Sequence, residues 1–94
     1  MSDAYGILLS PDALEDLRAL DSREVRRVLD AIGTRLATSP EMYGKPMGGR
    51  LAGLRRVRVG DLRVVYRVRP DVVEVLIIQM RKSVYSDLGK RLGL

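Results

Sequence analysis

The sequence of 94 residues contains no cysteine and no histidine. Without cysteine there is no disulfide, no zinc–thiolate site and no thiol nucleophile. Without histidine the chain lacks both the most common metal ligand and the usual general base at neutral pH. We therefore predict no metal site, and any proton transfer must use arginine, lysine, tyrosine, a carboxylate, the substrate or water.

Large aromatic residues are also scarce, since phenylalanine and tryptophan are absent and only four tyrosines occur. The core must therefore be aliphatic. A chain of 94 residues has room for one core, so we predict a single domain over residues 1–94. Residues 1–11 lack a basic start, and their apolar run is too short for a signal peptide or a membrane span, so we expect a cytoplasmic protein.

Negative charge is in the minority, with 12 Asp and Glu against 17 Lys and Arg, a net charge of +5 and a pI near 10.1. This balance favours a polyanionic partner, nucleic acid first. The arginines are concentrated between Arg50 and Arg69. That clustering, more than the net charge, indicates a site for an anion.

The first half of the sequence predicts a strand and two helices. The apolar run Tyr5–Leu9 is typical of a strand. Ser10 and Pro11 then suit the N-cap and the first turn of a helix. Asp21 with Glu24 resembles a capping box at the start of a second helix.

The segment after the second helix is rich in glycine and proline. Ser39 and Pro40 are predicted to end the helix, and residues 41–53 are predicted to form a loop. Lys45 lies in this loop and carries no specific signal.

Two arginine-containing strands flank Gly60-Asp61, a two-residue turn signal that predicts a β-hairpin. Pairing across this turn places Arg58 opposite Arg63. Because side chains alternate between the faces of a strand, one face is apolar. It consists of Val57, Val59, Leu62, Val64, Tyr66 and Val68. The other face is basic and consists of Arg56, Arg58, Arg63, Arg67 and Arg69.

The last third of the sequence predicts another strand and a short helix. A turn at Pro70-Asp71 leads into the apolar run Val72–Met80, which suits the middle of a sheet. Residues 83–92 are predicted to be helical. The order βααβββ plus a short C-terminal helix predicts an α+β fold, a small, mainly antiparallel twisted sheet with the two N-terminal helices on one face. We expect Tyr5–Leu9 to pair within this sheet.

Several charged residues have simple structural interpretations. The register after the hairpin places Arg67 opposite Glu74, where an ordinary cross-strand ion pair is expected. Arg69 is expected to be solvated at a strand end. Glu15 and Asp16 are predicted to be ordinary polar residues of a helix surface.

Other arginines lack such an explanation. Arg56, Arg58 and Arg63 have no acidic cross-strand partner in this register, and like charges opposite each other destabilise a sheet. Guanidinium groups bind phosphate oxygens in a bidentate manner, which predicts a phosphate site. Strict alternation would put Arg81 on the apolar face, which is unfavourable for an unpaired guanidinium. Either the last strand ends or bulges near Gln79, so that Arg81 and Tyr85 can reach the basic face, or Arg81 is paired to another group.

Two segments carry a family resemblance. The phrase LAGLRRVRVGDLRVVYRVR over residues 51–69 and the phrase IQMRKSVYSDL over residues 78–88 resemble the RelE/ParE superfamily of toxins from toxin–antitoxin operons. The Arg-x-x-Val-Tyr part of the second phrase is similar to RelE-like ribonucleases, whereas ParE-like gyrase poisons as a rule lack it.

This resemblance implies a ribosome-dependent endoribonuclease that cuts mRNA in the A site by attack of the ribose 2′-OH, without a metal or cofactor. It also implies an acidic antitoxin partner, beside the ribosome and mRNA. By motif, the catalytic residues are Arg56, Arg58, Arg63, Arg81 and Tyr85. Further contacts with RNA or ribosome are predicted for Arg55, Lys82, Lys90 and Arg91.

Two alternatives stay open. One is a ParE-like toxin that inhibits gyrase by protein contact, and the other is an inactive component that binds the antitoxin and represses its own operon. Some members of the family carry lysine on the first hairpin strand, where this sequence has Arg56 and Arg58. Since arginine is a poor general base, the general acid and base remain unassigned.

Overall fold

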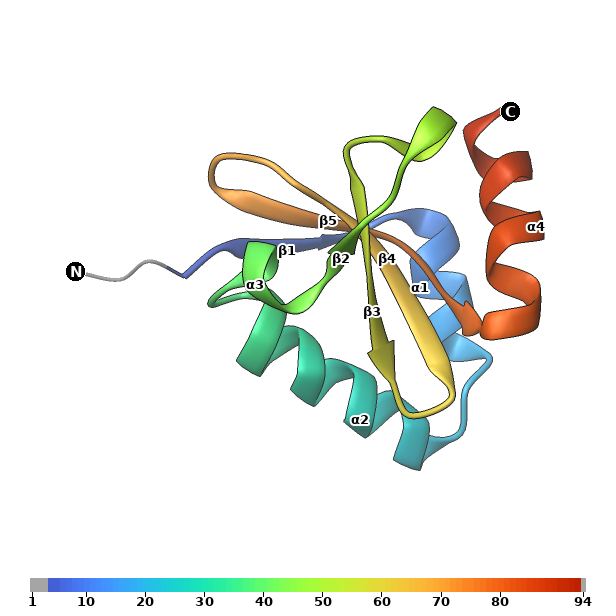
Figure 1. Ribbon diagram of the computed structural model, residues 1–94. Helices are drawn as coiled ribbons and strands as arrows, with labels where there is room; N and C mark the ends of the chain where they lie inside the picture. The colour runs from blue at the N-terminus through green and yellow to red at the C-terminus, as the bar shows by residue number, and fades with distance from the viewer. Residues whose placement is uncertain (1–3, 94) are drawn as a thin grey trace.

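The computed structural model describes residues 4–93, apart from the side chain of Tyr85. Its frame is one five-stranded sheet with the strand order β1-β5-β4-β3-β2 (Figure 1). The strands are β1 (Gly6–Leu9), β2 (Lys45–Pro46), β3 (Leu54–Val59), β4 (Leu62–Val68) and β5 (Val72–Met80). β1 runs parallel to β5, and the other neighbours are antiparallel. The predicted α+β class, the first strand's place in the sheet and the interior position of the fifth are confirmed.

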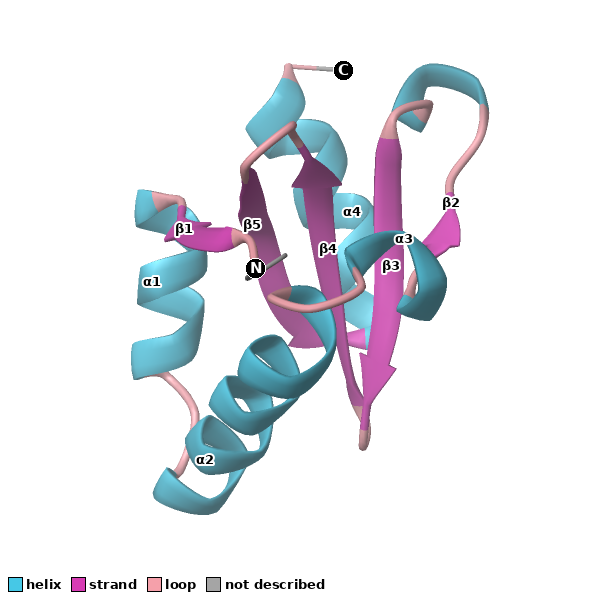
Figure 2. Cartoon of the chain, turned by 90° about the vertical axis from the view of Figure 1, so that its left-hand side faces the viewer, coloured by secondary structure: helices cyan, strands magenta, loops and turns pink. Residues whose placement is uncertain are grey.

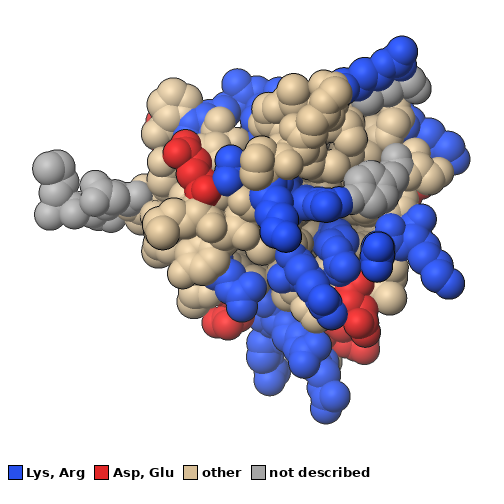
Figure 3. All heavy atoms as spheres, in the orientation of Figure 1, with Lys and Arg blue, Asp and Glu red and all other residues tan. Residues whose placement is uncertain are grey.

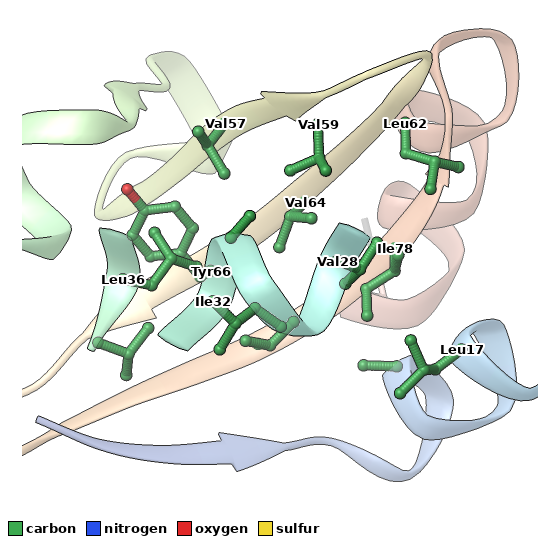
Figure 4. Packing of buried hydrophobic residues seen from close by; sticks show 14 residues of the cluster. Leu17, Val28, Ile32, Leu36, Val57, Val59, Leu62, Val64, Tyr66 and Ile78 are labelled. Atoms are coloured by element: carbon green, nitrogen blue, oxygen red, sulfur yellow. The ribbon is translucent and has the colours of Figure 1, made fainter. Parts of the chain in front are cut away.

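Two N-terminal helices, α1 (Pro11–Arg18) and α2 (Ser22–Ala31), cover one face of the sheet, and α2 continues into a π-helical segment, η1 (Ile32–Leu36) (Figure 2). The predicted caps are confirmed, because the side chains of Ser10 and Asp21 accept hydrogen bonds from the third residue beyond each of them. These helices bury their aliphatic side chains against the predicted apolar face of the hairpin (Figure 4).

The C-terminal helix α4 (Arg81–Leu92) packs on the opposite face, which the sequence predicted to be basic (Figure 2). There it forms a second, smaller apolar cluster whose fully buried or nearly buried members are Leu54, Val65, Ile77, Val84 and Leu88. This face is therefore not basic throughout, because α4 covers Leu54 and Val65 on it. Arg58 and Arg63 lie next to the hairpin turn.

Residues 41–53 are more ordered than the predicted loop. They include most of a short helix α3 (Pro40–Tyr43), the two-residue strand β2 and a 3-10 turn η2 (Gly49–Leu51). β2 extends the sheet beyond β3, with Lys45 paired to Arg56. A two-residue strand has no periodicity that a sequence can show, which explains why it was missed.

A β-bulge in β5 changes the face on which its last residues lie. Val65 pairs with Ile77 and Tyr66 with Val75, so Leu76 is the extra residue. Beyond it, Gln79 faces Arg63, on the basic side. The expected end or bulge near Gln79 is thus a bulge three positions earlier, followed by the end of the strand at Met80.

Side chains complete the hydrogen bonding around the bulge. The Leu76 carbonyl accepts from Ser10 Oγ at 3.3 Å and from Arg91 Nη1 at 3.0 Å. The Ile78 amide donates to Asp16 Oδ2 at 2.9 Å. β1 has already ended at Leu9, so α1 and α4 supply partners where the neighbouring strand no longer does. No helix within residues 4–93 has the length and apolar character needed to cross a membrane.

Candidate functional site

A pocket of about 550 Å³ lies at the outer edge of β3, within the size range of ligand sites. Its lining is strongly cationic, and none of its eight residues is acidic. They are Arg35, Tyr43, Lys45, Arg56, Val57, Arg58, Arg63 and Arg81. We call this the cationic pocket. Figure 3 shows lysine and arginine side chains gathered on the face of the molecule where β3 runs in Figure 1.

The hairpin places three of these cations. Arg58 and Arg63 are directly opposite each other, as predicted, on either side of the turn that begins at Gly60. Gly60 has φ near +60°, a conformation that glycine adopts without strain. Arg58 Nε donates to the Gly60 carbonyl at 3.0 Å, and Arg63 Nη1 donates to the Leu62 carbonyl at 3.2 Å. These contacts orient the guanidinium groups without cancelling their charge.

Arg81 enters the pocket from another direction. The bulge at Leu76 and the end of β5 at Met80 put it at the first position of α4, beside the hairpin arginines. The start of α4 has no side-chain cap. Its backbone amides and the helix dipole therefore add to the positive potential at this end of the pocket.

A polar network holds the segment that carries Tyr43 and Lys45. Arg55 Nη2 donates to the carbonyl oxygens of Glu41 at 2.6 Å and Gly44 at 2.8 Å. The hydroxyl of fully buried Tyr66 donates to the Pro40 carbonyl at 2.6 Å. Burial raises the pKa of Tyr66 in spite of the nearby Arg55 guanidinium, so the hydroxyl keeps its proton.

Gly44 is required by this packing. A Cβ at residue 44 would lie 1.9 Å from the Tyr66 hydroxyl, nearer than atoms can approach. The absence of a side chain lets α3 and β2 lie against the core.

Sequence reasoning missed three polar lining residues, Arg35, Tyr43 and Lys45. Arg35 is an exposed residue of η1, and the other two belong to the segment predicted as a loop. No spacing in the sequence links them to the hairpin. The one available signal was composition, because sites for single-stranded nucleic acid combine cationic and aromatic side chains.

Of the predicted catalytic residues, the structure brings together Arg56, Arg58, Arg63 and Arg81. The side chain of Tyr85 lies outside the described part of the chain. The four residues predicted to contact RNA or ribosome do not line the pocket; they are Arg55, Lys82, Lys90 and Arg91. Lys82 and Lys90 are exposed on α4, Arg55 holds the network described above, and Arg91 is paired.

Arg91 pairs with Asp16 of α1, through Nη2–Oδ1 at 2.8 Å and Nη1–Oδ2 at 2.9 Å. The prediction that Asp16 is an ordinary surface residue was wrong, since its side chain is only 9% exposed. Burial alone would raise the pKa of Asp16, but hydrogen bonds from Arg91, Ile78 and Gln79 and the charge of Arg91 bring it below its usual value. The neighbouring Glu15 is an exposed helix-surface residue, as predicted, and pairs with Arg18 at 2.9 Å.

The remaining hairpin arginines are structural. Arg67 lies opposite Glu74 and 3.9 Å from its carboxylate, which confirms the predicted ion pair. Arg69 is also within 3.5 Å of Glu74, so the expectation that it is merely solvated was wrong. Both are partly exposed, and such pairs contribute about 0–1 kcal/mol.

The cationic pocket can bind phosphate groups and stabilise additional negative charge on them. Its guanidinium groups cannot exchange protons, because arginine stays protonated in proteins. Within residues 4–93, no cluster of three or more carboxylates could hold a metal ion.

Comparison with known proteins shows the family to which this chain belongs. Residues 7–85 match a family described as the ParE toxin of type II toxin–antitoxin system, parDE. The chain is 32% identical over 89 residues to the toxin RelE of Mycobacterium tuberculosis, covering 90% of this chain and 92% of that protein.

Solved structures agree in fold. The crystal structure of the RelBE2 toxin–antitoxin complex from Mycobacterium tuberculosis matches with a TM-score of 0.78 and 29% identity, covering 83% of this chain and 92% of that one. The archaeal RelE–RelB complex from Pyrococcus horikoshii has a TM-score of 0.60 and 26% identity, with coverage of 83% and 96%. The family match and the relative identify this chain as a member of the RelE/ParE superfamily, a RelE-like toxin of a type II toxin–antitoxin system.

Proposed function

We propose that this toxin is a ribosome-dependent endoribonuclease that cleaves mRNA in the A site and so inhibits translation. The observation that supports it is the cationic pocket, in which arginines from β3, β4 and the start of α4 converge. Such a concentration of guanidinium groups suits a phosphodiester better than a protein surface, because each group can donate two parallel hydrogen bonds to phosphate oxygens.

The proposed reaction is attack of the ribose 2′-OH on the adjacent phosphate, which gives a 2′,3′-cyclic phosphate and a 5′-OH. Negative charge grows on the non-bridging oxygens in the transition state. Arg56, Arg58, Arg63 and Arg81 line one pocket. We propose that they stabilise this charge, since cations that converge before the reaction need little reorganisation during it. Tyr85 is assigned, by resemblance, to stack on a base or orient the 2′-OH.

We also propose a small acidic antitoxin as the partner that silences the toxin. Two of the similar structures are complexes of a toxin with its antitoxin. The net charge of +5 and the absence of acidic residues from the pocket lining make an acidic segment a suitable occupant.

The test is primer extension on a defined mRNA in purified translating ribosomes. New 5′ ends inside A-site codons are expected with the unaltered toxin and not with the Arg81→Ala, Tyr85→Ala double variant. Arg18→Ala removes one charge from an exposed helix pair that does not line the pocket. It is the matched control and should cleave normally.

Inhibition of gyrase is the second candidate, because the matching family is described by the ParE toxin. It predicts intact mRNA in the ribosome assay and loss of gyrase supercoiling activity when the toxin is added. If neither activity is found, the chain acts only as an antitoxin-binding component.

A further inference from the structure

We infer that Lys45 is the general acid of this site, the residue that gives a proton to the departing 5′ oxygen. The inference rests on the proposed ribonuclease function and deepens it. It assigns a catalytic role to a residue of β2, a strand that has only two residues.

The position of Lys45 is fixed by the sheet. It pairs directly with Arg56, and the Met47 amide just beyond β2 donates to the Leu54 carbonyl at 2.9 Å. On the other side, Arg55 holds the Gly44 carbonyl at 2.8 Å. The Lys45 side chain is exposed and lines the cationic pocket. The pairing places the Lys45 amine and the Arg56 guanidinium at the same end of the pocket, where both can act on one anion.

Lys45 differs from most of its neighbours in the pocket in that it can transfer a proton. Five of the pocket's cations are arginines, which hold their protons throughout the physiological range. Among the lining residues that the structure describes, only Lys45 and Tyr43 have a side-chain proton that can be transferred. Lysine is cationic before it donates and neutral afterwards. Its positive charge therefore lies beside the phosphate early in the reaction, and proton donation later removes one charge from the crowded cations.

The 2′ oxygen forms a bond to phosphorus and its proton passes to water, while the bond from phosphorus to the 5′ oxygen breaks. The Lys45 ammonium gives its proton to that oxygen, which leaves as a 5′-OH. The neutral amine then takes a proton from solvent, so the protein ends unchanged.

Replacing Lys45 with arginine tests the role of its proton separately from the role of its charge. Lys45→Arg keeps a cation at the same place and removes the transferable proton, whereas Lys45→Met removes both. Rates are measured on ribosomes with an mRNA that the unaltered toxin cuts at a known codon. We expect both variants to be slower by about 10²-fold or more, the usual size of a general-acid effect. Melting temperatures should be unchanged, because the side chain is exposed.

A sulfur-substituted message makes the test specific. In an mRNA whose scissile 5′ oxygen is replaced by sulfur, the leaving thiolate needs no protonation, because thiols are far more acidic than alcohols. Lys45→Arg should cleave this linkage at close to the unaltered rate. Arg63→Ala should remain slow on it, because that variant lacks stabilisation of the phosphate oxygens.

Three results would overturn the inference while leaving the ribonuclease function in place. The first is a normal cleavage rate of Lys45→Arg on the ordinary message. The second is slow cleavage by Lys45→Arg on both messages. The third is a Tyr43→Phe variant that is slow on the ordinary message and cleaves the sulfur-substituted message at the unaltered rate, which would make Tyr43 the general acid. Absence of cleavage by the unaltered toxin would instead reject the proposed function, and the inference with it.

Discussion

Arg91 donates hydrogen bonds to both carboxylate oxygens of Asp16, at 2.8 and 2.9 Å, although the two residues are 75 positions apart in the chain. The contact ties the end of α4 to α1. Since α4 begins with Arg81 of the cationic pocket, the same contact helps to fix one side of the candidate site. Stability and site geometry are therefore coupled through this helix.

Replacing Asp16 with asparagine should destabilise the protein by about 2–3 kcal/mol, because a largely buried guanidinium loses its counter-charge. Urea unfolding followed by circular dichroism measures this loss. Glu15→Gln breaks only an exposed pair and should change the free energy of unfolding by less than about 0.5 kcal/mol. Equal effects of the two substitutions would show that the Asp16–Arg91 pair adds nothing beyond a surface contact.

The Asp16 carboxyl should also make stability depend on pH in the acid range. Its pKa in the folded protein is lowered from the ordinary value of 3.8, so the folded state favours the ionised form. The resulting stabilisation is fully present above that ordinary value and is lost as the pH falls through the lower, folded value. The difference in unfolding free energy between the unaltered protein and Asp16→Asn should therefore be constant above about pH 5 and shrink below about pH 4. A constant difference down to the lowest pH would contradict the lowered pKa.

Arg63→Ala should reduce cleavage without unfolding the protein. The loss of one donor to the phosphate is expected to cost about 10²-fold in rate. Its side chain is on the polar face of the hairpin, so the free energy of unfolding should change by less than about 0.5 kcal/mol. The measurements are the ribosome assay and a thermal melt. A large fall in melting temperature would mean that Arg63 supports the fold and not the reaction.

Gly44→Ala should disturb the pocket from a distance. The new methyl group would collide with the Tyr66 ring and hydroxyl, so α3 and β2 must move and carry Tyr43 and Lys45 away. We expect the free energy of unfolding to fall by about 1–3 kcal/mol, typical of overpacking. Cleavage activity should fall as well, because Tyr43 and Lys45 leave their positions in the pocket. Gly48→Ala is the matched control, since a Cβ there meets nothing within 4 Å and the backbone has ordinary φ. Calorimetry of both variants measures the stability. Equal stability of Gly44→Ala and Gly48→Ala would contradict the prediction.

Binding to RNA should weaken steeply with salt. For a single-stranded oligonucleotide, the logarithm of affinity falls by about 0.7 per neutralised phosphate for each unit in the logarithm of salt concentration. Arg58→Ala should lower this slope by about 0.7, the contribution of one phosphate, while Arg18→Ala should leave the slope unchanged. Fluorescence anisotropy across a salt titration gives the slopes. An affinity that does not change with salt would rule out electrostatic docking.

The hairpin could be predicted in detail because its information is local. A two-residue turn fixes the register, and once Gly60-Asp61 is recognised the facing of Arg58 and Arg63 follows from alternation. The family phrase then added Arg81, for which alternation alone gave the wrong face. Four of the five predicted catalytic residues indeed line one pocket.

What the sequence could not show depends on distant partners. The bulge at Leu76 is stabilised by Ser10 and Arg91, each remote in the chain. Asp16 looks like any helix-surface carboxylate until Arg91 is placed beside it. β2 exists because Arg55 and the Tyr66 packing hold the segment before it. In each case a side chain from elsewhere decides the local structure.

The short length of β2 has one more consequence. Its pairing with β3 covers only Arg55 and Arg56, so among the described residues the outer side of Val57–Val59 has no strand beside it. Exposed strand edges invite self-association, and charged side chains oppose it. Arg58 is an exposed, charged residue of this edge and lines the cationic pocket, so its charge opposes edge-to-edge association of copies of the protein. A partner that neutralised this charge would remove that protection unless it also covered the strand.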